Sequence, residues 1–494
     1  MKPIPRLVLP VMLATALAAA CATHRARTVP DPSIVLICVD DMGWGDFIAP
    51  GPEQDARRGY RTPNLDRLAR GGMRFTNAYA AQSVCSASRA ALLTGCYPNR
   101  IGIGGALGPT DERGLAPQET TIAELYQRRG HPTALYGKWH LGRPPEHSPL
   151  RHGFDEWYGV PWSHDMCPTH PESPQAWGDL PRYEGRALPA PNAPDEHVLG
   201  WNLDPSDLTR EIGARAAAFV ERHAGGPFFL YVAHPLPHVP LAVSEPFRGR
   251  SAAGLYGDVL EEIDAELGRL LDALEQSGAA RDTLLLFTSD NGPWLSYGEH
   301  AGASGGLREG KGTAFEGGVR VPLLAHWPAR IPAASVCDEP VMLIDVLPTI
   351  AELLGTGPEL PIDGRSLVPL LEGERLAAPL HEVLYFYYDG NALEALRAGR
   401  WKLHFPHRYR TLAPDTARAS GGKPVKYASA EIGLALFDLE ADPGETRDLS
   451  SEHPQVVHEL EALAERARAE LGDGLSGRKG ARVREPSRTR SPDR

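Results

Sequence analysis

The chain contains few cysteines for its length, six among 494 residues. Small secreted domains that depend on disulfides carry many more cysteines per residue, so this chain is not built on a disulfide framework. Cys96, Cys167 and Cys337 are also widely scattered along the sequence. The sequence leaves room for one bridge and requires none.

Positive charge is scarce as well, since 51 lysines and arginines face 63 aspartates and glutamates and give a formal net charge of −12. This balance argues against a nucleic-acid partner, which needs a basic surface. Hydrophobic residues make up 42% of the chain and charged residues 23%, which excludes wholesale disorder. The 51 glycines and 46 prolines predict a compact protein with many loops.

Long apolar runs are missing, and no stretch of the sequence is long enough to span a bilayer. The apolar run from Leu7 to Ala20 is too short, and it follows Lys2 and Arg6, which is the pattern of a secretory signal peptide over residues 1–21. The residues before Cys21 also resemble a bacterial lipoprotein signal, in which this cysteine carries a lipid anchor, while plain cleavage before it is the alternative. We therefore expect export, either to the periplasm or to a membrane as an anchored lipoprotein, with secretion as a third destination.

Apolar strands alternate with amphipathic helices from about residue 31 to residue 375. The runs 33–39, 228–232 and 283–288 are continuously apolar, which is typical of buried parallel strands. Between the last two, apolar residues from Val259 to Leu274 recur at helical spacing. The pattern predicts an α/β domain with a large, mainly parallel sheet and helices around it. Further predicted elements are a helix at 62–71, a strand at 73–79 and a helix near 90–93.

The character of the sequence changes after Pro379, and we expect a smaller C-terminal α+β subdomain over residues 380–471. Its predicted helix covers Gln455 to Leu471, where apolar residues recur at helical spacing. Residues 472–494 are rich in glycine, serine, arginine and proline without periodicity, which predicts a disordered tail. The predicted strands of a small antiparallel sheet are 383–388, 401–405 and 434–439.

Two pairs of polar residues stand directly after predicted strands. Asp40 and Asp41 follow the first strand, and Asp290 and Asn291 follow the strand at 283–288. Open α/β sheets place their ligands at the carboxyl ends of such strands. Three carboxylates and one amide are oxygen donors suited to a hard divalent cation such as Ca²⁺ or Mg²⁺. The alternative is that each pair only caps a helix or shapes a turn.

A second polar cluster runs from Cys85 to Arg89 and opens the helix predicted near residues 90–93. A lone cysteine in an exported protein is ordinarily a buried residue or a bridge partner. Here it is surrounded by hydroxyl side chains beside a helix N-terminus that favours anions. The residue types alone do not identify the function of this cluster.

The cluster resembles the type I sulfatase signature, cysteine-x-proline-or-alanine-x-arginine followed by threonine-glycine, which this chain completes with Thr94 and Gly95. Other elements of the family pattern follow in the expected order between about residues 33 and 470. They are Val39 to Gly43, Gly137 to Gly142, Gly159 to Asp165, His238-x-Pro240, Ser289 to Gly292, Gly310 to Arg320 and Leu436 to Glu445. On these motifs the chain is identified as a member of the formylglycine-dependent sulfatases of the alkaline phosphatase superfamily.

The resemblance implies an alkaline phosphatase-like fold and an arylsulfatase-like sulfuric ester hydrolase. In this family a maturation enzyme oxidises the signature cysteine to formylglycine (3-oxoalanine), so Cys85 would supply the nucleophile as the aldehyde hydrate. Residues at the family's metal-ligand positions would hold Ca²⁺, with Mg²⁺ as the alternative ion. These residues are Asp40, Asp41, Asp290 and Asn291.

The family pattern also implies roles for the remaining site residues. Arg89 would hold the hydrate, and His140 would act as the base on its second hydroxyl. Lys138, His238 and Lys311 would bind the sulfate oxygens, and His238 or Lys311 would protonate the leaving oxygen. Ser163 matches a family position that touches the sulfate or the hydrate.

The sequence leaves open the maturation system, the substrate and two rival functions. Ala87 stands where the commonest signature has proline, which leaves open which maturation system acts on Cys85. The substrate is a sulfated small molecule or glycan, and an arylsulfate, a sulfated sugar and a sulfated polysaccharide end all fit. A phosphonate or phosphodiester hydrolase of the same superfamily is a rival, but such enzymes typically place histidine where Asn291 stands. A non-catalytic lipoprotein that binds sulfated glycans is a second rival, and the complete set of site residues argues against it.

Overall fold

The computed structural model describes residues 30–188, 194–413, 416 and 419–489. The predicted signal segment and Cys21, and with them the predicted lipid anchor, lie outside these residues. None of the helices in the described part of the chain has the length and apolar character needed to cross a bilayer.

An eleven-stranded sheet forms the centre of the described chain, in the order β11-β2-β10-β9-β1-β8-β4-β5-β6-β7 with β12 beside β2. The five neighbouring strands from β9 to β5 are parallel, whereas β10, β6 and β7 run antiparallel to their neighbours. The bounds are β1 (Ser33–Val39), β2 (Met73–Tyr79), β4 (Thr133–Lys138), β5 (Glu156–Val160), β6 (Pro181–Arg186), β7 (Asp195–Trp201), β8 (Phe229–Ala233), β9 (Thr283–Ser289), β10 (Arg320–His326), β11 (Ser335–Cys337) and β12 (Val341–Met342).

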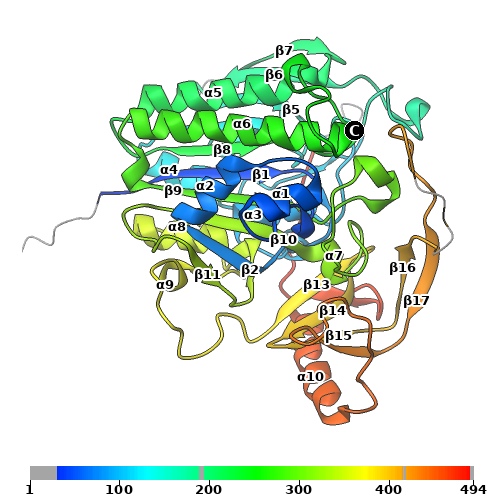
Figure 1. The fold of residues 1–494 in the computed structure, drawn as a ribbon. Helices are drawn as coiled ribbons and strands as arrows, with labels where there is room; N and C mark the ends of the chain where they lie inside the picture. The colour runs from blue at the N-terminus through cyan, green and yellow to red at the C-terminus, as the bar shows by residue number, and fades with distance from the viewer. Residues whose placement is uncertain (1–29, 189–193, 414–415, 417–418, 490–494) are drawn as a thin grey trace, which may run out of the picture. The chain divides into compact units, whose positions relative to one another are not determined.

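Helices cover both faces of this sheet (Figure 1). Successive side chains of a strand point to opposite faces, so Val35 and Ile37 of β1 pack against one helix layer while Ile34 and Leu36 pack against the other. The first layer contains α2 (Pro63–Gly71), α5 (Leu208–His223) and α6 (Gly254–Gln276). The second contains α3 (Cys85–Thr94), α4 (Ile122–Arg128) and α8 (Val346–Leu354). Shorter helices are α1 (Pro52–Arg58), α7 (Glu316–Val319) and α9 (Val368–Leu371).

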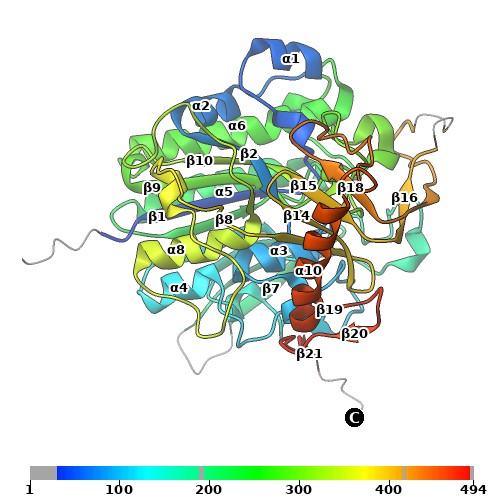
Figure 2. The same ribbon diagram turned by 90° about the horizontal axis from the view of Figure 1, so that it is seen from below.

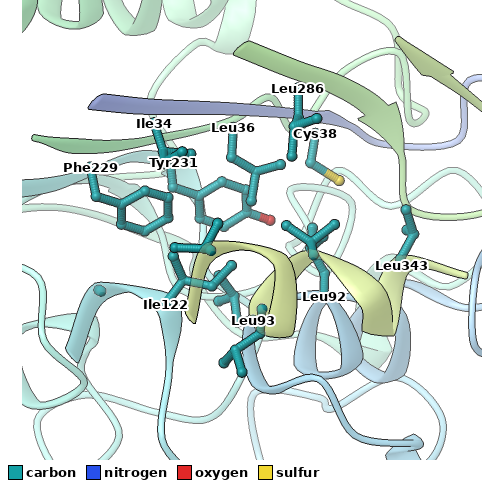
Figure 3. Packing of buried hydrophobic residues seen from close by; sticks show 14 of the residues in the cluster. Ile34, Leu36, Cys38, Leu92, Leu93, Ile122, Phe229, Tyr231, Leu286 and Leu343 are labelled. Carbon is teal, nitrogen blue, oxygen red and sulfur yellow. The ribbon is translucent and has the colours of Figure 1, made fainter. Parts of the chain in front are cut away.

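The second layer holds α3 against the sheet. Figure 3 shows Leu36 of β1 and Tyr231 of β8 facing Leu92 and Leu93 of α3, and all four side chains are buried. This packing fixes α3, and therefore Cys85 at its first position, relative to the carboxyl ends of the parallel strands. The predicted fold class, a mainly parallel sheet between helix layers with a smaller C-terminal subdomain, is confirmed.

The C-terminal subdomain is a four-stranded antiparallel sheet in the order β13-β14-β15-β18, with helix α10 (Pro454–Leu471) against it (Figure 2). The predicted strands at 383–388, 401–405 and 434–439 correspond to β13 (Leu384–Tyr388), β15 (Trp401–His404) and β18 (Ala435–Asp438). A strand that the sequence did not indicate, β14 (Ala392–Ala398), lies between β13 and β15. A separate hairpin is formed by β16 (His407–Thr411) and β17 (Ala428–Ile432).

Buried charges join this subdomain to the larger part of the chain. Lys402 of β15 donates to Glu316 at 2.9 Å and lies 3.2 Å from Glu445. Glu445 also accepts from the backbone N–H of Glu316, at 2.7 Å, and bonds the ring of His404 at 2.8 Å. All four residues are fully buried, so the network ties the segment that follows Lys311 to the C-terminal sheet.

The prediction of a disordered tail is wrong for residues 472–489. Here β19 (Gly472–Asp473) pairs with β20 (Arg478–Lys479), and β21 (Ser487–Arg488) pairs with β3 (Arg113–Gly114). Arg484 between them donates to the buried Glu119 at 2.7 and 2.8 Å. Residues 472–489, which we call the strap, are ordered by partners elsewhere in the chain rather than by their own apolar residues. Their composition therefore gave a wrong prediction. Residues 490–494 lie outside the described part.

Candidate active site

Five neighbouring parallel strands deliver polar side chains to one edge of the sheet. Because parallel strands all end at the same edge, residues at the ends of these strands or within a few positions after them converge there. The strands and their residues are β1 with Asp40 and Asp41, β9 with Asp290 and Asn291, β4 with Lys138 and His140, β8 with His238, and β5 with Ser163. All of them are buried.

The predicted cation ligands form a single cluster. The backbone N–H of Asp41 donates to Asp290 at 3.2 Å, and the Asn291 amide donates to Asp41 at 2.7 Å. One carboxylate oxygen each from Asp40 and Asp290 lies within 4.8 Å of the Cys85 sulfur and of the other. The structure therefore brings together the four residues that the sequence placed after two different strands, and sets Cys85 beside them.

The donor atoms of this cluster fit a divalent cation. Oδ1 of Asp40 and Oδ1 of Asn291 are buried and accept no hydrogen bond from the described residues. A buried acceptor without a partner costs about 1–3 kcal/mol, and more when it is charged. A hard cation bound by oxygen atoms would satisfy both acceptors, and carboxylate and amide oxygens are ligands for Ca²⁺ and Mg²⁺.

Two lysines pair with carboxylates of the cluster. Lys138 donates to Asp40, and Lys311 donates to both oxygens of Asp41, at 2.7 and 2.9 Å. Burial opposes the ionisation of Asp40, but the nearby positive charges, first Lys138 and then Arg89 and Lys311, together outweigh burial and hold the pKa of that carboxyl well below its usual range. Burial likewise opposes the charge of Lys311, yet Asp41 raises the pKa of its ammonium. Asp40 likewise raises the pKa of the Lys138 ammonium against the effect of burial, so both lysines are charged at neutral pH, as anion binding requires.

Arg89 lies one helical turn after Cys85 on α3 and points into the carboxylates. Its Nε and Nη2 are both 2.9 Å from Oδ2 of Asp290, and Nη1 is 3.3 Å from the carbonyl oxygen of Lys138. The resemblance implied that Arg89 holds the hydrate of the modified cysteine. In the structure its guanidinium is fully buried and fixes Asp290 as well.

Cys85 is a buried free thiol. Burial raises the pKa of this thiol, against the opposing effect of Lys138 and Lys311, so the unmodified side chain is mostly protonated at neutral pH. A protonated thiol is a poor nucleophile. The other described cysteines, Cys38, Cys96, Cys167 and Cys337, are also free.

His140 has one nitrogen held and one free. Its Nε2 is 2.9 Å from the carbonyl oxygen of Leu107, whereas Nδ1 is buried without a partner among the described residues. Burial and the Lys138 charge hold the pKa of this imidazole well below its usual value, so it is neutral at neutral pH. With Nε2–H donating to Leu107, Nδ1 carries the lone pair and can accept a proton. His140 also has a φ of 62°, and Asp41 one of 68°, values that are uncommon for non-glycine residues and that cluster at functional sites.

His238 completes the group near Asp41. Its Nε2 lies 3.6 Å from Asp41, and its Nδ1 lies 2.6 Å from the carbonyl oxygen of Val239. The His164 ring packs edge-to-face on it, with ring centroids 5.7 Å apart. Ser163, directly before His164, is therefore placed at the same edge of the sheet.

Sequence reasoning missed three residues beside the predicted set, namely Trp294, Tyr388 and Arg410. Trp294 stands three residues after Asn291, and its ring lies 4.8 Å from the Lys311 ammonium. Tyr388 ends β13 and packs against the small cluster of Val84, Cys85 and Ala87, and Arg410 of β16 donates to the carbonyl oxygen of Lys311 at 2.8 Å. Only Trp294 carried a signal, because it closely follows the second metal-ligand pair.

Comparison with known families accounts for this arrangement. Residues 32–356 match the family model described as Sulfatase, and residues 380–481 match that of the C-terminal region of aryl-sulfatase. The chain belongs to the sulfatase family. It is a sulfuric ester hydrolase, and the family predicted from the motifs is confirmed.

Relatives of this sulfatase cover most of its length. It is 38% identical to arylsulfatase A of Bos taurus over 465 residues, 87% of each chain. It is 38% identical to N-acetylgalactosamine-6-sulfatase of Homo sapiens over 388 residues, 76% of this chain and 71% of the human one. The crystal structure of the PsFucS1 sulfatase from Pseudoalteromonas sp. superposes with a TM-score of 0.75 at 28% identity, covering 89% of this chain and 91% of that one.

Proposed function

We propose that this sulfatase hydrolyses an arylsulfate or a sulfated carbohydrate to the alcohol and inorganic sulfate, using formylglycine made from Cys85 and a bound Ca²⁺ or Mg²⁺. The observation that carries the proposal is the position of Cys85. It lies within 4.8 Å of carboxylate oxygens of Asp40 and Asp290, in a cluster that two charged lysines also face.

The cation and the aldehyde hydrate would supply chemistry that the unmodified side chains of the site do not offer. A divalent cation neutralises negative charge on the sulfate and polarises the attacking hydroxyl, and an aldehyde hydrate provides that hydroxyl together with a second one. Asp40, Asp41, Asp290 and Asn291 would hold the cation through the oxygen atoms described above. Arg89 would hold the hydrate while keeping Asp290 in place.

The remaining residues bind the sulfate and move protons. Lys138, Lys311 and His238 surround the cluster and would bind sulfate oxygens, with Ser163 beside them. The leaving oxygen takes its proton from Nε2 of His238 or from the Lys311 ammonium. Nδ1 of His140 accepts the proton from the second hydroxyl, because it is the free nitrogen of a neutral ring.

We also propose that the protein is exported, that a maturation enzyme modifies Cys85 and that Cys21 carries a lipid anchor. The charged start and short apolar run before Cys21 support export. The signature from Cys85 to Arg89 supports recognition by a maturation enzyme. A periplasmic or membrane-anchored location follows from export and from the lipid anchor.

The mass of one tryptic peptide tests the modification. Trypsin releases the peptide from Phe75 to Arg89, and in protein made in its own kind of host we expect a mass lower by the thiol-to-aldehyde difference. The same preparation should release sulfate from a chromogenic sulfate ester and leave a matching phosphonate ester intact. Unmodified cysteine in an active preparation would overturn the formylglycine mechanism, and faster turnover of the phosphonate ester would favour the rival hydrolase.

A further inference from the structure

Two aromatic side chains beside the site, Trp294 and Tyr388, take no part in the sulfate chemistry, and we call them the aromatic wall. Trp294 is half-buried, and the Lys311 ammonium lies 4.8 Å from the centre of its ring. The His238 ring packs edge-to-face on it, with ring centroids 5.4 Å apart. Tyr388 is also half-buried and packs against the small cluster that contains Cys85. Both rings therefore lie next to groups that would bind the sulfate or attack it.

Arg410 adds a positive charge beside this wall. Its guanidinium lies 4.7 Å from the Tyr427 ring and 5.9 Å from the Trp294 ring, and its Nε and Nη2 both donate to the carbonyl oxygen of Lys311, which leaves the Nη1 side of the guanidinium for a ligand. It comes from the β16–β17 hairpin of the C-terminal subdomain, whereas Trp294 follows β9. The two parts of the chain thus meet next to Lys311.

The charge of Arg410 differs from the other charges of the site in having no acidic partner. Lys138 is paired with Asp40 and Lys311 with Asp41, and Arg89 is paired with Asp290. Arg410 forms no ion pair with any carboxylate of the described residues. A half-buried, unpaired guanidinium beside an anion site can bind a carboxylate or sulfate with two hydrogen bonds.

We propose that Trp294, Tyr388 and Arg410 form the subsite for the leaving group, and that this subsite takes a ring carrying a second anionic group. The aromatic side chains offer faces against which a sugar or aryl ring packs, and Arg410 offers the charge for a carboxylate or a further sulfate on it. The proposal rests on the function proposed above, because it concerns the alcohol part of the same ester.

The test compares two chromogenic esters that differ by one carboxylate, 4-nitrophenyl sulfate and 3-carboxy-4-nitrophenyl sulfate. The ratio of their kcat/KM values is measured for the wild type and for Arg410→Gln, so that differences in leaving-group acidity cancel. We expect Arg410→Gln to lower kcat/KM for the carboxylated ester at least about fivefold more than for the other ester. Arg408→Gln is the matched control, because Arg408 lies on the same strand, is exposed and should leave the ratio unchanged.

An equal loss for both esters would overturn the proposal, since it would mean that Arg410 only holds the carbonyl oxygen of Lys311. For Trp294→Leu we expect a higher KM for both esters with the charge discrimination kept, and an unchanged KM would remove Trp294 from the subsite. A wild type that carries formylglycine but hydrolyses neither ester would contradict the proposed function itself. Hydrolysis of both esters without an effect of Arg410→Gln on their ratio would contradict only the subsite.

Discussion

The Lys311 ammonium donates to both carboxylate oxygens of Asp41, at 2.7 and 2.9 Å, although 270 residues separate the two in the chain. Asp41 is also one of the four oxygen ligands proposed for a divalent cation. A cation on Asp41 would compete with Lys311 for the same oxygens. Cation binding is therefore expected to turn the Lys311 ammonium toward the sulfate. Binding of the cation and binding of the sulfate should then strengthen each other.

Removing the Cys85 side chain should abolish sulfate release without unfolding the protein. Cys85→Ala deletes the precursor of the nucleophile but only one buried sulfur atom, so we expect no measurable turnover and a melting temperature within a few degrees of the wild type. Cys337→Ala, which changes a buried cysteine far from the site, should keep full activity. Sulfate release by Cys85→Ala at the wild-type rate would contradict the assignment.

The oxygen of Asn291 is expected to contribute to cation affinity. Asn291→Ala removes a buried oxygen that accepts no hydrogen bond within the described part of the chain, and we expect calcium affinity to fall about 10- to 100-fold by analogy with altered metal sites. A calcium titration followed by calorimetry measures the change. The control is Asn77→Ala, because Asn77 donates to Asp338 outside the site. An unchanged affinity in Asn291→Ala would remove this residue from the ligand set.

The buried lysine of the C-terminal sheet is expected to be important for stability. Lys402→Met leaves Glu316 and Glu445 buried without their lysine, and loss of one partner of a buried ion pair costs about 3–5 kcal/mol. Urea unfolding should show this decrease in the free energy of unfolding. Lys426→Met, at an exposed position, should change it by less than about 0.5 kcal/mol. Equal effects of the two substitutions would show that the network contributes nothing.

Ionisation of the buried Glu394 should lower the free energy of unfolding as the pH rises. Burial, reinforced by Asp389, raises the pKa of Glu394 from 4.5 to about 8. Between these values the folded state binds the extra proton and the unfolded state does not, so the free energy of unfolding falls as pH increases. Glu394→Gln cannot ionise and should remove this loss, gaining on the order of 3 kcal/mol over the wild type between pH 5 and pH 8.

Urea unfolding of both proteins at the two pH values measures the difference. The exposed Glu431→Gln is the control and should follow the wild-type profile. A Glu394→Gln profile parallel to that of the wild type would mean that Glu394 ionises normally in the folded protein.

The strand-end residues could be predicted because their signal is local. An apolar run that ends in Asp40 and Asp41 locates both the strand and the edge of the sheet where its ligands lie. Arg410 could not be found in this way, since it reaches the site by contacting Lys311, 99 residues away, from a hairpin without a motif. The same limit applies to Arg484, whose partner Glu119 is 365 residues distant.

Strand β14 was missed for another reason. Residues 392–398 are mostly alanine, leucine, glutamate and arginine, which favour helices as isolated residues. Their position between β13 and β15 buries almost all of them, so tertiary packing overrides the local preference.

The buried position of Cys85 has a consequence for the timing of biosynthesis. An enzyme that modifies this thiol needs access to it, and the finished fold gives almost none, since the residue is 2% exposed. The strap that pairs with β3 and reaches Cys96 through Arg484 is made about 400 residues later, which at 5–20 residues per second means on the order of 20–80 seconds of translation. During that interval the contacts between the strap and the residues around α3 have not formed, so the maturation enzyme proposed above would reach Cys85 before the chain closes over it.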